Sequence, residues 1–86
     1  MTKVENIVRS FRYALEQDKI EAKMKNIKFN PFWFSNSTER SSILLGEVTV
    51  EEAVDLYNRY GISSENEDDR ITYRVDDLEK FESAIA

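Results

Sequence analysis

The chain has 86 residues, 41% hydrophobic and 12% aromatic, with a net charge of −5 at pH 7; this composition predicts one folded domain over residues 1–86, because disordered chains are poorer in hydrophobic residues. It contains no cysteine and no histidine, which excludes disulfides, thiolate nucleophiles, histidine bases and the commonest zinc ligands. The sequence has neither an apolar run long enough for a membrane span nor a signal-peptide pattern, so we expect a cytoplasmic protein without a membrane partner.

The first part of the sequence predicts a helix over residues 3–17. Apolar side chains recur there every three or four positions, at Val4, Ile7, Val8, Phe11, Ala14 and Leu15. Further along the same helix, Ile20, Met24 and Ile27 would lie on the opposite face, so the helix must either break or expose a second apolar face. Asp18 and Glu21 form a capping-box pattern. We therefore expect a break, followed by a short helix over residues 19–26.

The middle of the sequence predicts irregular and extended structure. Residues 29–34 hold four aromatic side chains around the only proline, Pro31, so we expect an extended segment or an edge strand there. Residues 35–42 are polar and predict a loop. Residues 42–46 form a short apolar run, which fits either a buried strand or a turn of helix.

A third helix is predicted over residues 50–60. Thr49 and Glu52 form a capping box before it, and Gly61 follows it as a typical helix C-terminal residue.

The last part of the sequence predicts a loop, a strand and a helix. Residues 63–69 are polar and acidic, and we expect a loop. Residues 70–75 alternate between polar and apolar side chains, as a half-buried strand does. Asp76 and Glu79 form another capping box, which opens a final helix. The predicted fold is α+β, with three main helices packed on a small two- or three-stranded sheet in a single compact domain.

The acidic residues do not predict an enzyme. Residues 65–69 lack the glycine and distal glutamate of a calcium-binding EF-hand loop and are interpreted as a solvated turn. Glu51 with Glu52 and Asp76 with Asp77 supply adjacent carboxylates, but neighbouring helical residues point about 100° apart and do not converge on a substrate. Without histidine, cysteine or a glycine-rich phosphate loop, we expect no catalysis, no metal and no cofactor.

Charge and aromatic residues point instead to macromolecular contacts. Residues 1–43 carry a net charge of +3 and residues 44–86 a net charge of −8. In residues 1–43, the lysines at positions 19, 23, 25 and 28 could contact the phosphates of a nucleic acid. The overall negative charge of the chain opposes nucleic-acid binding. Most of the aromatic residues at positions 32–34 are expected to fill the core, and at least one is expected to be an exposed interface anchor.

Two segments resemble parts of excisionase-type winged-helix proteins. Residues 48–54 look like the start of that family's helix-turn-helix, and residues 73–81 look like the last strand of the wing and the closing helix. The resemblance implies a basic, DNA-reading recognition helix between them. That place holds Ile62 to Arg70, which is acidic and short, so we do not assign the chain to the family.

The sequence therefore predicts a small non-enzymatic acidic binding protein whose partner is another protein. The residues assigned to this contact are Glu51, Glu52, Asp55, Glu65, Glu67, Asp68, Asp69 and Trp33. One specific form is an inhibitor that presents carboxylates where a nucleic-acid-handling target expects phosphates, as small phage proteins acting on host nucleases do. The alternatives are a nucleic-acid-binding regulator that uses the basic N-terminal helices, and a structural homodimer subunit.

Overall fold

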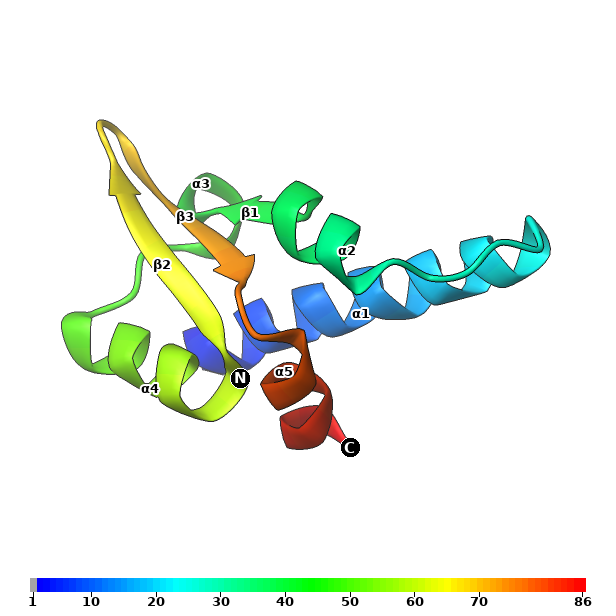
Figure 1. Cartoon of the computed structure of the whole chain (residues 1–86). Helices are drawn as coiled ribbons and strands as arrows, with labels where there is room; N and C mark the ends of the chain where they lie inside the picture. Colours follow the sequence, from blue (N-terminus) through cyan, green and yellow to red (C-terminus); the bar gives the residue numbers. More distant parts are fainter. Residues whose placement is uncertain (1) are drawn as a thin grey trace.

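The computed structural model describes residues 2–86, which form five helices and one three-stranded antiparallel sheet (Figure 1). In chain order the elements are α1 (Lys3–Met24), α2 (Pro31–Ser37), β1 (Glu39–Ser41), α3 (Ser42–Leu45), α4 (Val50–Tyr60), β2 (Ile62–Glu67), β3 (Arg70–Val75) and α5 (Leu78–Ile85). The predicted α+β class is confirmed, and the sheet has three strands.

The sheet has the order β1-β3-β2, with both pairs antiparallel. β2 and β3 form a hairpin in which Glu67 faces Arg70 across a turn made by Asp68 and Asp69. The expectation of a loop over residues 63–69 was therefore wrong. It failed because only Ile62 of β2 is fully buried, so the strand depends on its backbone pairing with β3 and carries almost no apolar pattern.

α1 is one continuous helix, and the predicted break before residues 19–26 does not occur. Its first part buries Ile7, Phe11 and Leu15, as expected from their spacing. Its last turns project beyond the sheet (Figure 1) and expose Ile20 and Met24, which are 52% and 82% accessible. The capping-box pattern was misleading because no glycine or proline interrupts residues 3–24, so the hydrogen-bonded helix continues and shows its second apolar face to solvent.

α2 lies where an extended aromatic segment was expected. The side chain of Asn30 accepts a hydrogen bond of 3.1 Å from the Trp33 amide and caps the helix. Pro31 occupies the first turn, where its missing N–H costs nothing because the first amides of a helix lack intrahelical acceptors. The proline therefore starts a helix here.

The segment after α2 also differs from expectation. Residues 35–42 were expected to form a loop, but they contain the end of α2 and the whole of β1. The apolar run at residues 42–46 forms the single-turn helix α3, one of the two structures that the sequence left open.

α4 and the start of α5 are held together at Gly61. α4 has the predicted bounds, and Thr49 and Glu52 form the predicted capping box. Gly61 adopts a φ of 66°, and its carbonyl oxygen accepts hydrogen bonds from the amides of Asp76 and Asp77. The N-cap of α5 is Asp77, which accepts from the Lys80 amide, so the capping box predicted at Asp76 was one residue out of register.

The hydrophobic core lies between α1, α4, α5 and one face of the sheet. Its residues are Ile7, Phe11, Ala14, Leu15, Phe34, Leu56, Ile62, Tyr73, Val75, Leu78 and Phe81. Every element except β1 and α3 contributes a residue, so the core fixes α4 against the hairpin.

The connectivity from α1 onward is similar to that of winged-helix domains. β1 is followed by α3 and α4, which a four-residue segment joins as a helix-turn-helix, and then by the β2–β3 hairpin, whose last strand lies in the centre of the sheet. The sequence reasoning looked for the second helix of this unit at residues 62–70. Residues 62–70 form no helix, because they belong to the β2–β3 hairpin, which extends from Ile62 to Val75.

Candidate functional site

Seven of the eight predicted contact residues lie on α4 and the hairpin, which are neighbours in the fold. Glu51, Glu52 and Asp55 belong to α4. The others are Glu65 and Glu67 of β2 with Asp68 and Asp69 of the adjoining turn. In Figure 1 these elements occupy the end of the molecule opposite the projecting turns of α1. We call these seven residues together the acidic face, although Glu65 and Glu67 pair with Thr72 and Arg70 and so lie on the sheet face opposite the core residues Tyr73 and Val75.

Four of these carboxylates are engaged within the fold. Glu52 accepts a hydrogen bond of 2.8 Å from the Thr49 amide and completes the cap of α4. Asp55 pairs with Arg59 at 3.4 Å. Within the hairpin, Glu67 and Asp69 lie 3.8 and 3.9 Å from nitrogens of Arg70. The capping role of Glu52 was predicted, whereas the ion pairs of Asp55, Glu67 and Asp69 were not.

The remaining three carboxylates are available for contact. Glu51, Glu65 and Asp68 are exposed and have no ion pair or side-chain hydrogen bond with any residue in the range 2–86. They are therefore the residues of the acidic face whose charge is least neutralised by the protein itself.

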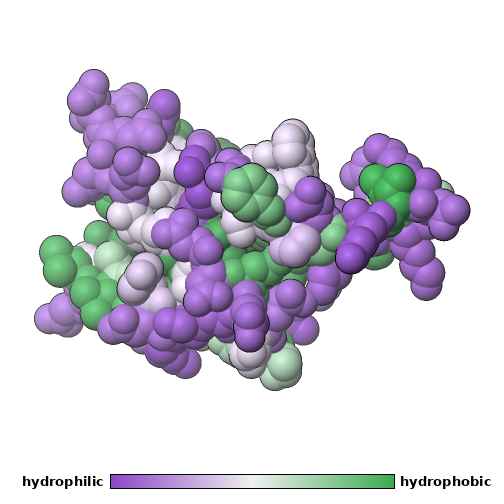
Figure 2. All heavy atoms as spheres, in the orientation of Figure 1, coloured by the Kyte–Doolittle hydropathy of each residue, from purple (hydrophilic) through white to green (hydrophobic). Residues whose placement is uncertain are grey.

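An apolar stripe on α4 adjoins the acidic face, and the sequence reasoning missed it. Val50, Val54 and Tyr57 are 81%, 52% and 54% accessible, and their spacing places them along one side of the helix. Figure 2 shows hydrophobic surface next to hydrophilic surface at this end of the molecule. The spacing was visible in the sequence, but it was used only to predict a helix.

A shallow groove runs between this stripe and β2. It has a volume of about 400 Å³, and its lining residues are Val50, Ala53, Val54, Tyr57, Asn58, Ser63 and Ser64. The hydroxyl oxygen of Ser64 is buried and has no hydrogen-bond partner within residues 2–86. The groove thus offers mainly apolar contact area.

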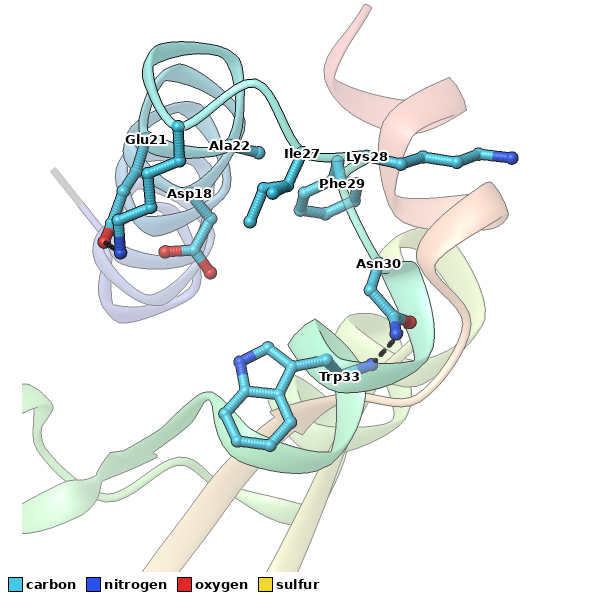
Figure 3. Close-up of a pocket in the computed structure, with 9 residues that line it drawn as sticks. Asp18, Glu21, Ala22, Ile27, Lys28, Phe29, Asn30 and Trp33 are labelled. Atoms are coloured by element: carbon cyan, nitrogen blue, oxygen red, sulfur yellow. Dashed lines mark hydrogen bonds and ion pairs between the residues drawn. The ribbon is translucent and has the colours of Figure 1, made fainter.

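Trp33, the eighth predicted residue, lies elsewhere. It is on α2, 66% accessible, and lines a pocket of about 410 Å³ between α2, the last turns of α1 and the segment that joins them (Figure 3). Phe32 is also exposed, whereas Phe34 is fully buried. The expectation that one of these aromatics would be exposed is confirmed, but the majority do not fill the core.

Two of the four lysines at positions 19–28 are paired with acids. Lys25 pairs with Glu21 at 2.7 Å, and this contact lowers the pKa of Glu21 and raises the pKa of Lys25, through their hydrogen bond first and their charges second. Lys19 pairs with Glu82 at 2.6 Å and lies 5.6 Å from the centre of the Phe29 ring. This pairing reduces the positive field that was expected to attract phosphates.

Two kinds of site are not found in the described part of the chain. Within residues 2–86, no three acidic, histidine or cysteine side chains gather as a metal site would need. No helix in the same range is both long and apolar enough to cross a membrane.

Comparison of the chain with protein-family models, with curated proteins and with solved structures found no match.

Proposed function

We propose that this is a non-enzymatic binding protein that contacts a basic surface of another protein through the acidic face and the apolar stripe of α4. The observation that carries the proposal is the position of Val50, Val54 and Tyr57, which are exposed beside carboxylates without intramolecular partners. Apolar and aromatic side chains in a polar surround supply most of the affinity in protein interfaces. Charged residues at the rim supply orientation and association rate.

The acidic face also favours one class of partner. In helix-turn-helix proteins the second helix enters the DNA major groove, where it meets phosphates and base edges. Here the corresponding helix, α4, carries Glu51 and Glu52 in its first turn, and the turn of the wing-like hairpin consists of Asp68 and Asp69. Such a surface repels DNA and suits a protein that itself binds phosphates. We propose a nucleic-acid-handling protein as the partner and inhibition by carboxylates in phosphate positions as the mode of action.

The test is capture of partners from a lysate by wild-type protein and by two charge-reversed variants. Glu51→Lys with Glu65→Lys alters the acidic face and leaves the capping residue Glu52 intact. Glu16→Lys with Asp76→Lys makes the same change in net charge on α1 and before α5. A specific partner is retained by wild type and by the second variant and is lost from the first. Equal retention by both variants contradicts the proposal.

A second arm of the test addresses the nucleic-acid alternative. The retained material is treated with nuclease before elution, and its nucleic-acid content is measured. Nucleic acid bound directly to the purified protein, with no protein required, would replace the proposed function by the regulator that uses the basic N-terminal helices. A protein partner that survives nuclease treatment supports the proposed function.

A further inference from the structure

The pocket beside Trp33 has the chemistry of a site for an organic cation. Its lining residues are Asp18, Glu21, Ala22, Lys25, Ile27, Lys28, Phe29, Asn30 and Trp33. Figure 3 shows the indole of Trp33 on one side of the pocket and the carboxylate of Asp18 on another, with Ile27 and Phe29 along the side opposite Trp33. A cation between an aromatic ring and a carboxylate is stabilised by two interactions, a cation–π contact with the ring and an ion pair with the carboxylate.

The pocket is lined by two acids, Asp18 and Glu21, and by two lysines, Lys25 and Lys28, and Asp18 is the acid that neither lysine pairs with. Lys25 is held by Glu21 at 2.7 Å, and the side chain of Lys28 extends away from the pocket (Figure 3). Asp18 is half-buried and has no ion pair or side-chain hydrogen bond within residues 2–86. The local balance thus leaves the Asp18 carboxylate without a counter-charge, and an anionic ligand such as a phosphate would meet repulsion here.

The shape and polarity of the pocket favour a guanidinium group over an ammonium group. A guanidinium is planar, so it can lie against the indole of Trp33 while it donates two parallel hydrogen bonds to one carboxylate. The side-chain carbons below it can rest on Ile27 and Ala22, which are apolar. The side-chain amide of Asn30 lies at the edge of the pocket, although its oxygen is occupied by the Trp33 amide.

We propose that this pocket binds an arginine side chain of a protein partner. The proposal concerns a site at the end of α1, away from the acidic face, and it holds whether or not the acidic face is an interface. The source is assigned to a protein because the pocket is an open surface between two helices, and Lys28, its lysine without an ion pair in residues 2–86, extends away from it (Figure 3) and does not face the carboxylate of a free amino acid.

The chain's single tryptophan, Trp33, makes the test direct. Fluorescence of the wild-type protein is measured during titration with N-acetylarginine amide, which represents an arginine within a peptide, and with N-acetylcitrulline amide, its uncharged analogue. We expect a saturable change with a Kd on the order of millimolar for the arginine compound. The citrulline compound should bind about tenfold more weakly or not at all. Equal responses to the two compounds would overturn the proposal.

Two variants locate the effect at the pocket. Asp18→Asn keeps the shape of the side chain and should weaken binding of the arginine compound about tenfold. Glu16→Gln removes one negative charge from the same helix outside the pocket and should change the Kd less than twofold, which controls for net charge. Circular dichroism verifies that both variants fold. An unchanged Kd for Asp18→Asn contradicts the assignment of the carboxylate.

Two further ligands separate the other possible occupants. Free arginine carries the same guanidinium, and binding more than tenfold tighter than that of N-acetylarginine amide would assign the pocket to a metabolite instead of a protein side chain. Adenosine monophosphate tests stacking of a nucleobase on Trp33. Quenching by this nucleotide at lower concentration than by N-acetylarginine amide would overturn the cation assignment.

Discussion

The hydroxyl of Tyr73, in the central strand β3, donates a hydrogen bond of 2.7 Å to the carbonyl oxygen of Gly46, in the turn between α3 and α4. Tyr73 is fully buried. One side chain therefore ties the middle of the sheet to the turn that sets the start of α4, and so to the position of the acidic face.

Replacement of Tyr73 by phenylalanine removes this bond and leaves the Gly46 carbonyl without it. We expect the free energy of unfolding to fall by about 1–3 kcal/mol, the usual cost of an unsatisfied buried polar group. Urea denaturation followed by circular dichroism measures the change. A loss within error of zero would mean that the bond contributes nothing net to stability.

Ionisation of the same residue should lower the stability of the fold at alkaline pH. Burial raises the pKa of Tyr73 above its usual value of 10.0, and Glu47 and Glu52 raise it further, while a hydrogen bond from the Val48 backbone lowers it. Because the folded pKa is the higher one, the neutral hydroxyl stabilises the fold fully below pH 10, and this contribution falls as pH rises through the folded pKa.

The melting temperature should therefore be nearly constant from pH 6 to 8, where the chain has no histidine to titrate. It should fall above pH 10, and less so in Tyr73→Phe. Thermal melts across this range provide the measurement. A steep change between pH 6 and 8 would instead reveal an ionisable group with a strongly altered pKa.

Trp33 and Phe34 are adjacent in the chain, but their replacement by alanine should lower the free energy of unfolding by very different amounts. Trp33→Ala removes a side chain that is mostly exposed and should cost less than about 1 kcal/mol. Phe34→Ala leaves a cavity in the core and should cost about 3–5 kcal/mol. Denaturation by urea, monitored by circular dichroism because the first variant lacks tryptophan, compares the two. Similar losses would contradict the orientation of α2.

Gly61→Ala should destabilise the protein for two separate reasons. A left-handed φ of 66° disfavours alanine, which we expect to cost about 1–2 kcal/mol. The new Cβ would also lie 2.7 Å from the carbonyl oxygen of Asp77. Gly61→Asn separates these effects, because asparagine tolerates this φ but still carries a Cβ. Near-wild-type unfolding of the asparagine variant would show that backbone conformation alone matters.

Binding to duplex DNA should be weak in spite of the winged-helix connectivity. The chain has a net charge of −5, and seven of its acidic residues lie on α4 and the hairpin, so we expect a Kd of about 10⁻⁴ M or weaker at 0.15 M salt. An electrophoretic shift assay with random duplex DNA measures this affinity. Micromolar binding would favour the nucleic-acid regulator over the protein-binding function.

The sequence predicted the elements whose signals are local. α4 and β3 have the expected bounds, because a capping box with a terminal glycine and a strict polar-apolar alternation are complete within a few residues. The stripe on the first part of α1 was confirmed for the same reason. The fold class followed from these elements together.

The elements that sequence reasoning missed depend on distant partners. β2 is a strand because β3 lies beside it, and its own side chains are mostly polar. β1 has three residues and exists through its pairing with β3. At the candidate site, the sequence predicted which carboxylates contact a partner, but not which of them form ion pairs within the protein. Asp55 pairs with Arg59 one helical turn away, and Glu67 pairs with Arg70 because the hairpin brings the two side chains together.

β1 also bears on the kinetics of folding. Its register pairs Glu39 with Arg74, 35 positions along the chain, whereas β2 meets β3 across a two-residue turn. Closing the longer loop costs more conformational entropy, and non-local pairing slows folding. We therefore expect the β2–β3 hairpin to form before β1 joins the sheet, so that substitutions in β1 accelerate unfolding far more than they slow refolding.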